Sequence, residues 1–246
     1  MIDLIIFDND GTLVDSEPLG HSAMAAVLAA VGVQVDPRDL ADEFRGWELA
    51  LELRTLSQRH GIDLGDAHIA DYRTRLADLF EKELRPMPGA HAAVEAMATL
   101  GLRQAVASGG PMAKIEAALR ITRLRPWFEN RLYSSYDLGS FKPEPGLFLH
   151  VAEQFDCPPS RCLVIEDSDV GIEAARRAGM AAVLVGGQSP DQSPAETSQV
   201  QAPGLASPVR SPLDSPLDSP LDSLTHLASL DALPALVEAR LLAGRS

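Results

Sequence analysis

The sequence predicts an α/β protein: a Rossmann-like parallel sheet core with an inserted helical cap domain. Short apolar runs typical of buried strands alternate along the chain with segments of helical periodicity. About 95 residues separate the first two predicted strands, where one helix and two turns would suffice. The excess length indicates an insertion between these strands.

Five apolar runs predict the strands of the sheet. They lie at residues 4–7, 104–107, 131–133, 162–165 and 182–185. Runs that are apolar throughout suit strands buried on both faces, as in a parallel sheet. Helical patterns lie between them: Leu147, Phe148 and Val151 share one face, and another helix begins near Ile172 and ends at Gly179.

The long first crossover carries at least three amphipathic helical patterns, at residues 19–31, 49–56 and 69–79. Pro18 after Ser16 is typical of a first helical turn, and Gly32 is typical of a helix end. We therefore expect a cap domain at residues 15–85 and a core domain made of residues 1–14 and 86–246. Ligands of open α/β sheets bind at the carboxyl ends of the strands, so this cap would cover the site like a lid.

Residues 186–223 differ in composition from the rest of the chain. They hold seven of the 18 prolines and eight serines, and Ser-Pro-Leu-Asp occurs three times in tandem between Ser211 and Asp222. Because no apolar face repeats in this segment, we expect a disordered low-complexity loop. A tolerated insertion is favoured over a docking or modification segment.

Charge and composition narrow the range of partners. The chain has 21 basic and 35 acidic residues, a formal net charge of −14, which argues against nucleic acids and anionic membranes as partners. The sequence contains no run of 18 apolar residues, so it predicts no transmembrane helix. Its N-terminus lacks the basic region of a signal peptide. The two cysteines, Cys157 and Cys162, cannot form a disulfide framework. We expect a cytoplasmic protein, and the acidic surface favours a monomer.

Two acids follow the first predicted strand. Asp8 and Asp10 lie two residues apart and are followed by Gly11. Asp8 could act as a nucleophile or metal ligand, and Asp10 could act as an acid or base. Taken alone, the same pattern also fits a turn in which aspartates cap backbone amides.

Phosphate-binding candidates follow the second and third predicted strands. Ser108 and Gly109 place a hydroxyl and free amides in a glycine-rich turn, which can hold a phosphoryl group. Lys142 is one of only three lysines in the chain and supplies a compact positive charge. Taken alone, Ser108 and Gly109 are also compatible with an ordinary turn, and Lys142 with a lysine exposed to solvent.

Glu166 and Asp167 follow the fourth predicted strand. Because the carboxyl ends of parallel strands meet at one edge, we expect these acids to lie near Asp8 and Asp10. Hard carboxylate oxygens gathered there would form a site for Mg²⁺. A helix cap explains one acid or hydroxyl after this strand, but not two acids directly at its end.

The ordered set of motifs resembles the haloacid dehalogenase-like (HAD) superfamily. Residues 8–12 are similar to its first motif, Ser108 to its second, Lys142 to its third and residues 166–167 to its fourth. The resemblance spans about residues 1–185 and resumes at 224–242, and the inserted helices resemble its type 1 cap. Within the superfamily, the chain resembles the β-phosphoglucomutase and sugar-phosphatase branch.

This resemblance implies a role for each motif residue. Asp8 would attack phosphorus and form an aspartyl-phosphate, while Asp10 would protonate the leaving alkoxide and then activate water. Ser108, the Gly109 amide and Lys142 would hold the phosphoryl oxygens. The expected substrate is a small sugar or sugar-acid phosphate monoester.

The resemblance also implies a magnesium ion. Asp8, the main-chain carbonyl oxygen of Asp10, and Asp167 would hold Mg²⁺, with Glu166 as a further ligand or as a residue that orients the ligands. Without a cation between them, Asp8 and Asp167 would repel each other strongly.

The motifs are also compatible with two other functions. A phosphomutase would share the site, but β-phosphoglucomutases carry an arginine three residues after a cap glycine, where this chain has Leu49 after Gly46. A non-catalytic binding module would use the Ser-Pro-rich segment. Arg45, Trp47 and His21 are candidate substrate contacts in the cap, although a surface charge, a helix anchor and a solvated histidine explain them equally well.

Overall fold

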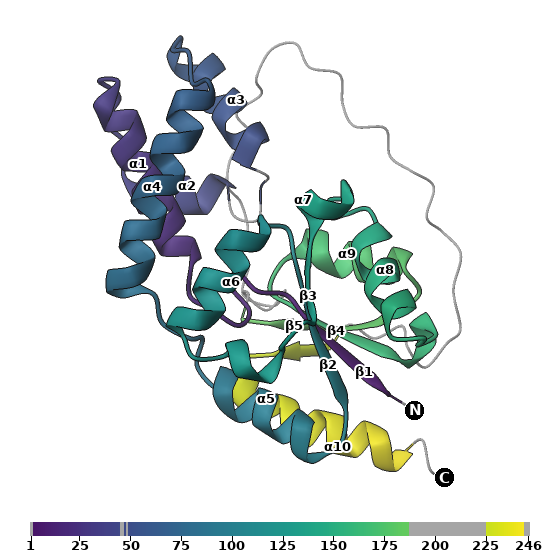
Figure 1. The fold of residues 1–246 in the computed structure, drawn as a ribbon. Helices are drawn as coiled ribbons and strands as arrows, with labels where there is room; N and C mark the ends of the chain where they lie inside the picture. Colours follow the sequence, from purple (N-terminus) through teal and green to yellow (C-terminus); the bar gives the residue numbers. More distant parts are fainter. Residues whose placement is uncertain (1, 45–46, 48, 187–224, 244–246) are drawn as a thin grey trace, which may run out of the picture.

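A six-stranded parallel sheet in the order β3-β2-β1-β4-β5-β6 forms the centre of the computed structural model, which describes residues 2–44, 47, 49–186 and 225–243 (Figure 1). The strands are β1 (Leu4–Phe7), β2 (Arg103–Ser108), β3 (Leu132–Ser134), β4 (Cys162–Glu166), β5 (Ala181–Val185) and β6 (Thr225–Leu227). This sheet confirms the predicted fold class. Because β1 pairs with both β2 and β4, the residues that follow these three strands are neighbours at one edge.

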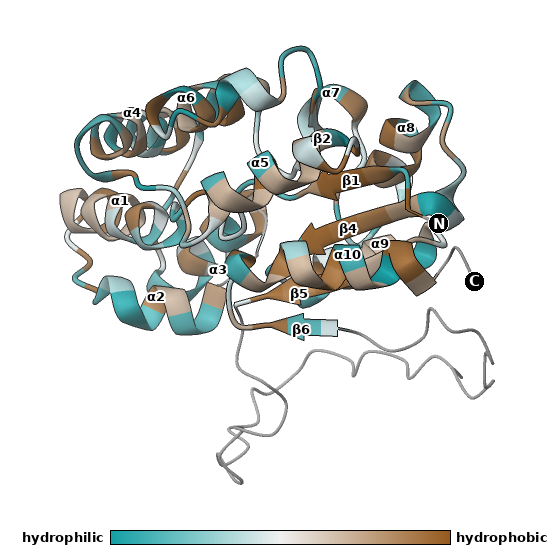
Figure 2. Cartoon of the chain, turned by 90° about the horizontal axis from the view of Figure 1, so that it is seen from below, coloured by the Kyte–Doolittle hydropathy of each residue, from teal (hydrophilic) through white to brown (hydrophobic). Residues whose placement is uncertain are grey.

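Helices cover both faces of the sheet, as Figure 2 shows. They are α5 (Ala90–Thr99), α6 (Met112–Ile121), α8 (Gly146–Gln154), α9 (Asp169–Arg177) and α10 (Leu233–Ala243). Ile5 and Phe7 of β1 belong to the apolar cluster with α5, α6 and α10. Leu4 and Ile6 belong to the cluster with α8 and α9. Alternate side chains of one strand thus enter opposite layers, which explains why the strand is apolar throughout.

Short helical turns connect these larger elements. They are η1 (Arg125–Trp127), α7 (Ser135–Leu138), η2 (Pro159–Arg161) and η4 (Leu230–Ala232).

Four helices follow β1 and lie together beside the sheet (Figure 1). They are α1 (Glu17–Ala30), α2 (Pro37–Phe44), α3 (Leu49–His60) and α4 (Asp66–Glu83). They share an apolar cluster that includes Met24, Leu28 and Leu56. Ser16 occupies the N-cap of α1 with a proline in its first turn, and Gly32 follows the helix with φ of +84°, as the sequence predicts.

The chain enters and leaves this group of helices through two adjacent segments. The amide of Asp15 donates to the carbonyl of Arg85 at 3.0 Å, and the amide of Met87 donates to the carbonyl of Leu13 at 2.9 Å. Val14 also forms a β-bridge with Pro86. The four helices are therefore joined to the sheet through one paired connection.

Each of the five predicted strands is confirmed with ends that differ by at most one residue. The sequence did not predict β6, which has only three residues, or α2, in which only Leu40 and Phe44 are buried. Of the loop predicted at residues 186–223, only Gly186 lies within the described residues.

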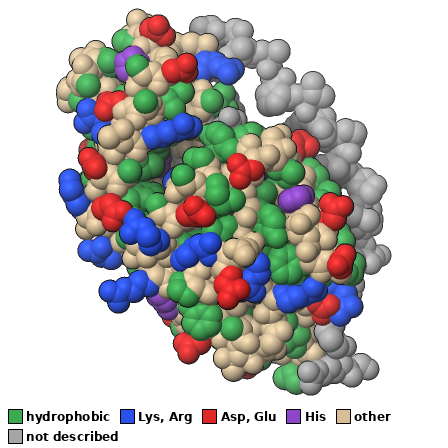
Figure 3. All heavy atoms as spheres, in the orientation of Figure 1, with side chains coloured by type: hydrophobic (Ala, Val, Ile, Leu, Met, Phe, Trp, Pro, Cys, Tyr) green, Lys and Arg blue, Asp and Glu red, His purple; other side chains and the backbone are tan. Residues whose placement is uncertain are grey.

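Among the described residues, no helix combines the length and apolar character needed to span a membrane. On the face shown in Figure 3, Lys and Arg side chains are interspersed with Asp and Glu side chains.

Gly89 provides a test of how the segment after residue 224 docks on the core. A Cβ at Gly89 would lie 2.5 Å from the Asp231 amide nitrogen, and the residue has φ of +79°. Gly32 has φ of +84°, but a Cβ there would meet no atom within 4 Å, so Gly32→Ala is the matched control. We expect Gly32→Ala to cost about 1 kcal/mol of unfolding free energy, and Gly89→Ala to cost about 2 kcal/mol more because of the clash. If urea unfolding gave the same loss of unfolding free energy for Gly32→Ala and Gly89→Ala, the close contact between Gly89 and Asp231 would be contradicted.

Candidate active site

Six predicted site residues converge at the C-terminal edge of the sheet. Asp8 and Asp10 follow β1, Ser108 ends β2, Glu166 ends β4 and Asp167 follows it. Lys142 reaches the same place from the loop before α8, where its ammonium group contacts both Asp8 and Glu166. The edge predicted from the strand pattern therefore gathers side chains that are up to 159 positions apart in the sequence.

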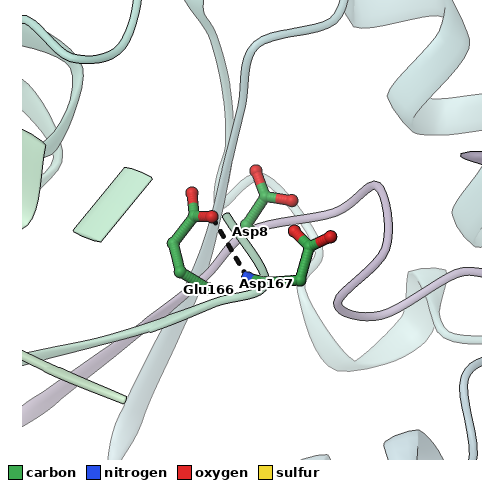
Figure 4. A group of neighbouring side chains, drawn as sticks. All are labelled: Asp8, Glu166 and Asp167. Carbon is green, nitrogen blue, oxygen red and sulfur yellow. Dashed lines mark hydrogen bonds between the residues drawn. The ribbon is translucent and has the colours of Figure 1, made fainter. Parts of the chain in front are cut away.

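Three of these residues form a compact acidic cluster (Figure 4). Carboxylate oxygens of Asp8, Glu166 and Asp167 lie within 4.8 Å of one another. Asp8 is 5% exposed and Glu166 is fully buried. These are hard oxygen ligands brought together by β1 and β4, which suits a divalent cation.

Glu166 is held in place by the protein on both carboxylate oxygens. Oε1 contacts Lys142, while Oε2 accepts hydrogen bonds from the Ser168 hydroxyl at 2.8 Å and from the amides of Asp167 and Ser168 at 3.2 Å. A Cβ at Gly171 would lie 2.0 Å from the Glu166 carboxylate, so α9 can pass this close only with glycine there. This arrangement favours Glu166 as an orienting residue over a direct metal ligand.

Lys142 is the main positive charge at the base of the site. Its Nζ donates to Oδ1 of Asp8 at 2.5 Å, and its ammonium lies 5.3 Å from the centre of the Phe148 ring. Burial alone would lower the pKa of Lys142, but the carboxylates of Asp8 and Glu166 raise it above its usual value. Lys142 is thus a fixed cation.

One lysine does not balance three carboxylates. Burial, followed by the charges of Glu166 and Asp10, raises the pKa of Asp8 to about 8 despite the opposing effect of Lys142. Burial and the charges of Asp8 and Glu166 raise the pKa of Asp167 to about 9. A further positive charge between Asp8 and Asp167 would remove this repulsion, so the donor set fits a divalent cation.

Gly11 allows this cluster to form. The turn after β1 passes so close to Asp167 that a Cβ at Gly11 would lie 2.1 Å from Oδ2 of Asp167, and Gly11 has φ of +76°. A side chain at this position would therefore displace Asp167. Glycine is therefore needed at position 11 both because a side chain would clash with Asp167 and because the backbone has a positive φ.

Asp10 has different partners from Asp8. Its Oδ1 accepts a hydrogen bond from the Ser16 hydroxyl at 2.5 Å and lies 2.9 Å from Nζ of Lys114. Its Oδ2 accepts from the Ser108 hydroxyl at 3.4 Å. Burial alone would raise the pKa of Asp10, but Lys114 and the Ser16 hydrogen bond outweigh it and lower the pKa below its usual value.

Lys114 and Ser16 were not predicted from the sequence as site residues. Lys114, on α6, is another of the three lysines of the chain and lies six residues after Ser108. Because lysine is scarce in this chain, the reasoning that indicates a role for Lys142 applies equally to Lys114. For Ser16, the helix-cap position gave no indication of a contact with Asp10.

A cavity of about 640 Å³ opens above these residues, between the sheet edge and helices α1, α3 and α4. Asp8, Asp10 and Lys142 line its base together with Gly109. The candidate cap residues His21 and Trp47 also line the cavity, whereas Arg45 lies outside the described residues.

Glu52 of α3 lines the same cavity and was not singled out from the sequence. It is 8% exposed, and burial raises its pKa to about 7. Its place in a helical pattern gave no sign that it is buried, because the predicted apolar face of that helix was Leu49, Leu53 and Leu56.

The fold and these side chains define a haloacid dehalogenase-like hydrolase, and the chain belongs to this family, which matches residues 2–179. Two relatives from Escherichia coli K12 are phosphatases. 6-Phosphogluconate phosphatase is 31% identical over 180 residues, which are 73% of this chain and 80% of the relative. Fructose-1-phosphate phosphatase is 32% identical over 186 residues, which are 74% of this chain and 95% of the relative.

A solved structure is also similar over almost the whole chain. The HAD family hydrolase from Deinococcus radiodurans R1, with bound phosphate and sodium, has a TM-score of 0.69 and 26% identity, and covers 98% of this chain and 97% of its own. The chain is therefore a phosphatase of the HAD type, related to enzymes that act on sugar phosphates.

The buried Glu52 carboxyl predicts a pH-dependent difference in stability. The folded state binds the Glu52 proton more tightly than the unfolded chain, so its contribution to stability falls as pH rises from about 4.5 through about 7. We expect Glu52→Gln to unfold with a free energy about 3 kcal/mol higher than the wild type at pH 8.5, and with no such gain at pH 4.

Urea unfolding of both proteins at the two pH values measures this difference. Glu43→Gln is the control, because Glu43 is exposed and the pKa of its carboxyl is lowered by its hydrogen bond with Arg59. It is expected to bring no gain at high pH. If Glu52→Gln changed the unfolding free energy equally at both pH values, the interpretation of Glu52 as a buried carboxyl with a raised pKa would be contradicted.

Proposed function

We propose that the protein hydrolyses a small sugar or sugar-acid phosphate monoester in a Mg²⁺-dependent reaction, through an aspartyl-phosphate on Asp8. The observation that carries this proposal is the position of Asp8. Its carboxylate lines the base of the cavity and lies 2.5 Å from the Lys142 ammonium. An anionic nucleophile beside a fixed cation suits attack on a phosphoryl group, whose oxygens carry the developing charge.

Phosphoryl binding is assigned to Ser108, the Gly109 amide and Lys142. The Ser108 hydroxyl accepts a hydrogen bond from the Gly110 amide at 3.0 Å, which orients it toward Asp10 and the cavity base. Gly109 lines the cavity and carries no side chain that would keep a phosphoryl group at a distance. These donors and Lys142 would surround the transferred group.

Asp10 is assigned as the acid and base. In the substrate-free state Lys114 and Ser16 favour its ionised form, which is the form that removes a proton from water when the aspartyl-phosphate is hydrolysed. Protonation of the leaving alkoxide needs the acid form of Asp10. A substrate that draws Lys114 away from Asp10 would raise the pKa of Asp10 and supply that form.

Magnesium is assigned to Asp8, the main-chain carbonyl oxygen of Asp10, and Asp167, with Glu166 as the orienting residue. When bound there, Mg²⁺ would neutralise charge on the phosphoryl oxygens and on the acidic cluster. The spacing of the carboxylates and the raised pKa of Asp167 support this choice of ligands.

The substrate class rests on the relatives together with the cavity. The names of two relatives that the chain covers well specify 6-phosphogluconate and fructose 1-phosphate. Both compounds carry several hydroxyl groups, and a cavity of about 640 Å³ has room for a molecule of this size. 6-Phosphogluconate is the first substrate to test.

Nothing among the described residues favours the mutase alternative. Leu49, which stands where a β-phosphoglucomutase would carry its arginine, lines the cavity as an apolar side chain. The Ser-Pro-rich segment of the binding-module alternative lies outside the described residues.

We further propose that helices α1 to α4 act as a cap domain over this site, with boundaries at residues 14/15 and 85/86. The paired segments at residues 13–15 and 85–87 support these boundaries, because they would let the helices move as one unit. A cytoplasmic location and a monomeric state stay predictions from the sequence.

Replacing the nucleophile tests the proposal. We expect Asp8→Asn to lower the rate of phosphate release from 6-phosphogluconate by about 10³-fold or more, because an amide oxygen cannot form the aspartyl-phosphate. The melting temperature should not fall, since the change removes one of three crowded carboxylates. Asp63→Asn, on the exposed turn between α3 and α4, is the control and should leave the rate unchanged. Retained turnover by Asp8→Asn would rule out a covalent role for this residue.

A further inference from the structure

Glu52 is a buried carboxyl group that the proposed chemistry does not use. It lies in the first turn of α3, on the cap side of the cavity, and only 8% of its surface is exposed. Its Oε1 is fully buried and accepts no hydrogen bond from the described residues. A buried oxygen acceptor without a donor is unfavourable in a folded protein, so this atom needs an explanation.

The described residues give no structural reason for a carboxylate at this position. No Lys or Arg among the described residues forms an ion pair with Glu52. Its neighbours along the helix, Leu53 and Leu56, pack into the apolar cluster of the cap. Burial, the one cause of its raised pKa, opposes folding at neutral pH. Within the described part of the chain, the ionised Glu52 carboxylate therefore costs stability rather than adding to it.

Tyr72 connects Glu52 with the reacting end of the cavity. This residue, on α4, also lines the cavity, and its hydroxyl interacts electrostatically with Lys114, Glu52 and Asp10. Lys114 and Asp10 come from the core, and Glu52 comes from the cap. The same cavity is thus lined by the acid-base residue Asp10 on the core side and by Glu52 on the cap side.

The organic part of a phosphate ester would occupy this compartment. With the phosphoryl group at Asp8 and Lys142, the leaving-group oxygen lies at Asp10, and the remainder of the molecule extends toward the cap. Leu49, Phe44 and Trp47 line the cavity near α3 with apolar side chains. Glu52 is then a buried hydrogen-bond acceptor that α3 offers to this part of the substrate.

We propose that Glu52 is a specificity-determining residue that selects hydroxylated phosphate esters by accepting a hydrogen bond from a hydroxyl group on the organic part of the substrate. This inference rests on the proposed function, because it names what the cap recognises in a substrate of the same site. A hydroxyl suits this position, because a carboxyl group can accept a hydrogen bond from a hydroxyl whether it is ionised or protonated. An ester without such a hydroxyl gains nothing from the part of Glu52 that lines the cavity.

Paired substrates test the proposal. Phosphate release by the wild type, Glu52→Gln and Glu52→Leu is measured with 6-phosphogluconate and glucose 6-phosphate, and with p-nitrophenyl phosphate and n-butyl phosphate, which have no hydroxyl on the organic part. We expect Glu52→Leu to lower kcat/KM for the hydroxylated esters by about 10- to 100-fold, and to change it less than about 2-fold for the others. Glu52→Gln keeps an oxygen acceptor and should lose less than Glu52→Leu.

Controls separate recognition from structure. Glu43→Leu removes an exposed carboxyl of the same cap that does not line the cavity, and should leave kcat/KM for all four esters unchanged. Melting temperatures of all variants are recorded, and Glu52→Ala, which also removes the acceptor, replaces Glu52→Leu with the same expected losses if Glu52→Leu does not fold. Equal losses on both classes of ester, or no loss on either, would overturn the role of Glu52. Failure of the wild type to release phosphate from any ester would instead overturn the proposed function, and this inference with it.

Discussion

The acidic cluster at the sheet edge is the constraint on which the rest of the site depends. Three carboxylates, from Asp8, Glu166 and Asp167, lie within 4.8 Å of one another, and one lysine cannot balance them. Two glycines allow the backbone to pack closely around this cluster. A Cβ at Gly11 would clash with the Asp167 carboxylate, and a Cβ at Gly171 would clash with the Glu166 carboxylate. The same crowding of hard oxygen ligands is why the cluster is the candidate site for a divalent cation.

Much of the fold could be predicted because its signals are local. Residues 4–7 and 162–165 are apolar throughout, since both faces of a central parallel strand are buried, and their ends are confirmed within one residue. The site edge followed from topology alone, because acids placed after adjacent parallel strands must meet there. β6 could not be predicted: three residues carry too short a pattern, and it pairs with β5 only through a long-range contact.

The site residues that the sequence pattern did not reveal act through distant partners. Lys114 belongs to the site because it forms an ion pair with Asp10, which lies more than 100 positions earlier in the sequence. The Ser16 hydroxyl donates to Asp10, although the sequence position of Ser16 indicates only a helix cap. In the sequence, Glu52 resembles any polar residue of an amphipathic helix. Its role in the cavity is visible only in the structure, where residues of the core line the same cavity. Sequence patterns indicate an element and its buried face, whereas these contacts depend on how separate elements pack against one another in three dimensions.

Magnesium binding should release protons from the acidic cluster, and counting them is the decisive measurement. Titration calorimetry of the full chain with MgCl₂ at pH 7.5, in buffers of different ionisation enthalpy, gives the number of protons released on binding. Because the pKa values of Asp8 and Asp167 are raised to about 8 and about 9 without a cation, both carboxyls are largely protonated at pH 7.5. We therefore expect release of roughly one to two protons per Mg²⁺, and a smaller release from Asp167→Asn. Binding without proton release, or no binding, would contradict an acidic cluster that needs a cation to stay ionised.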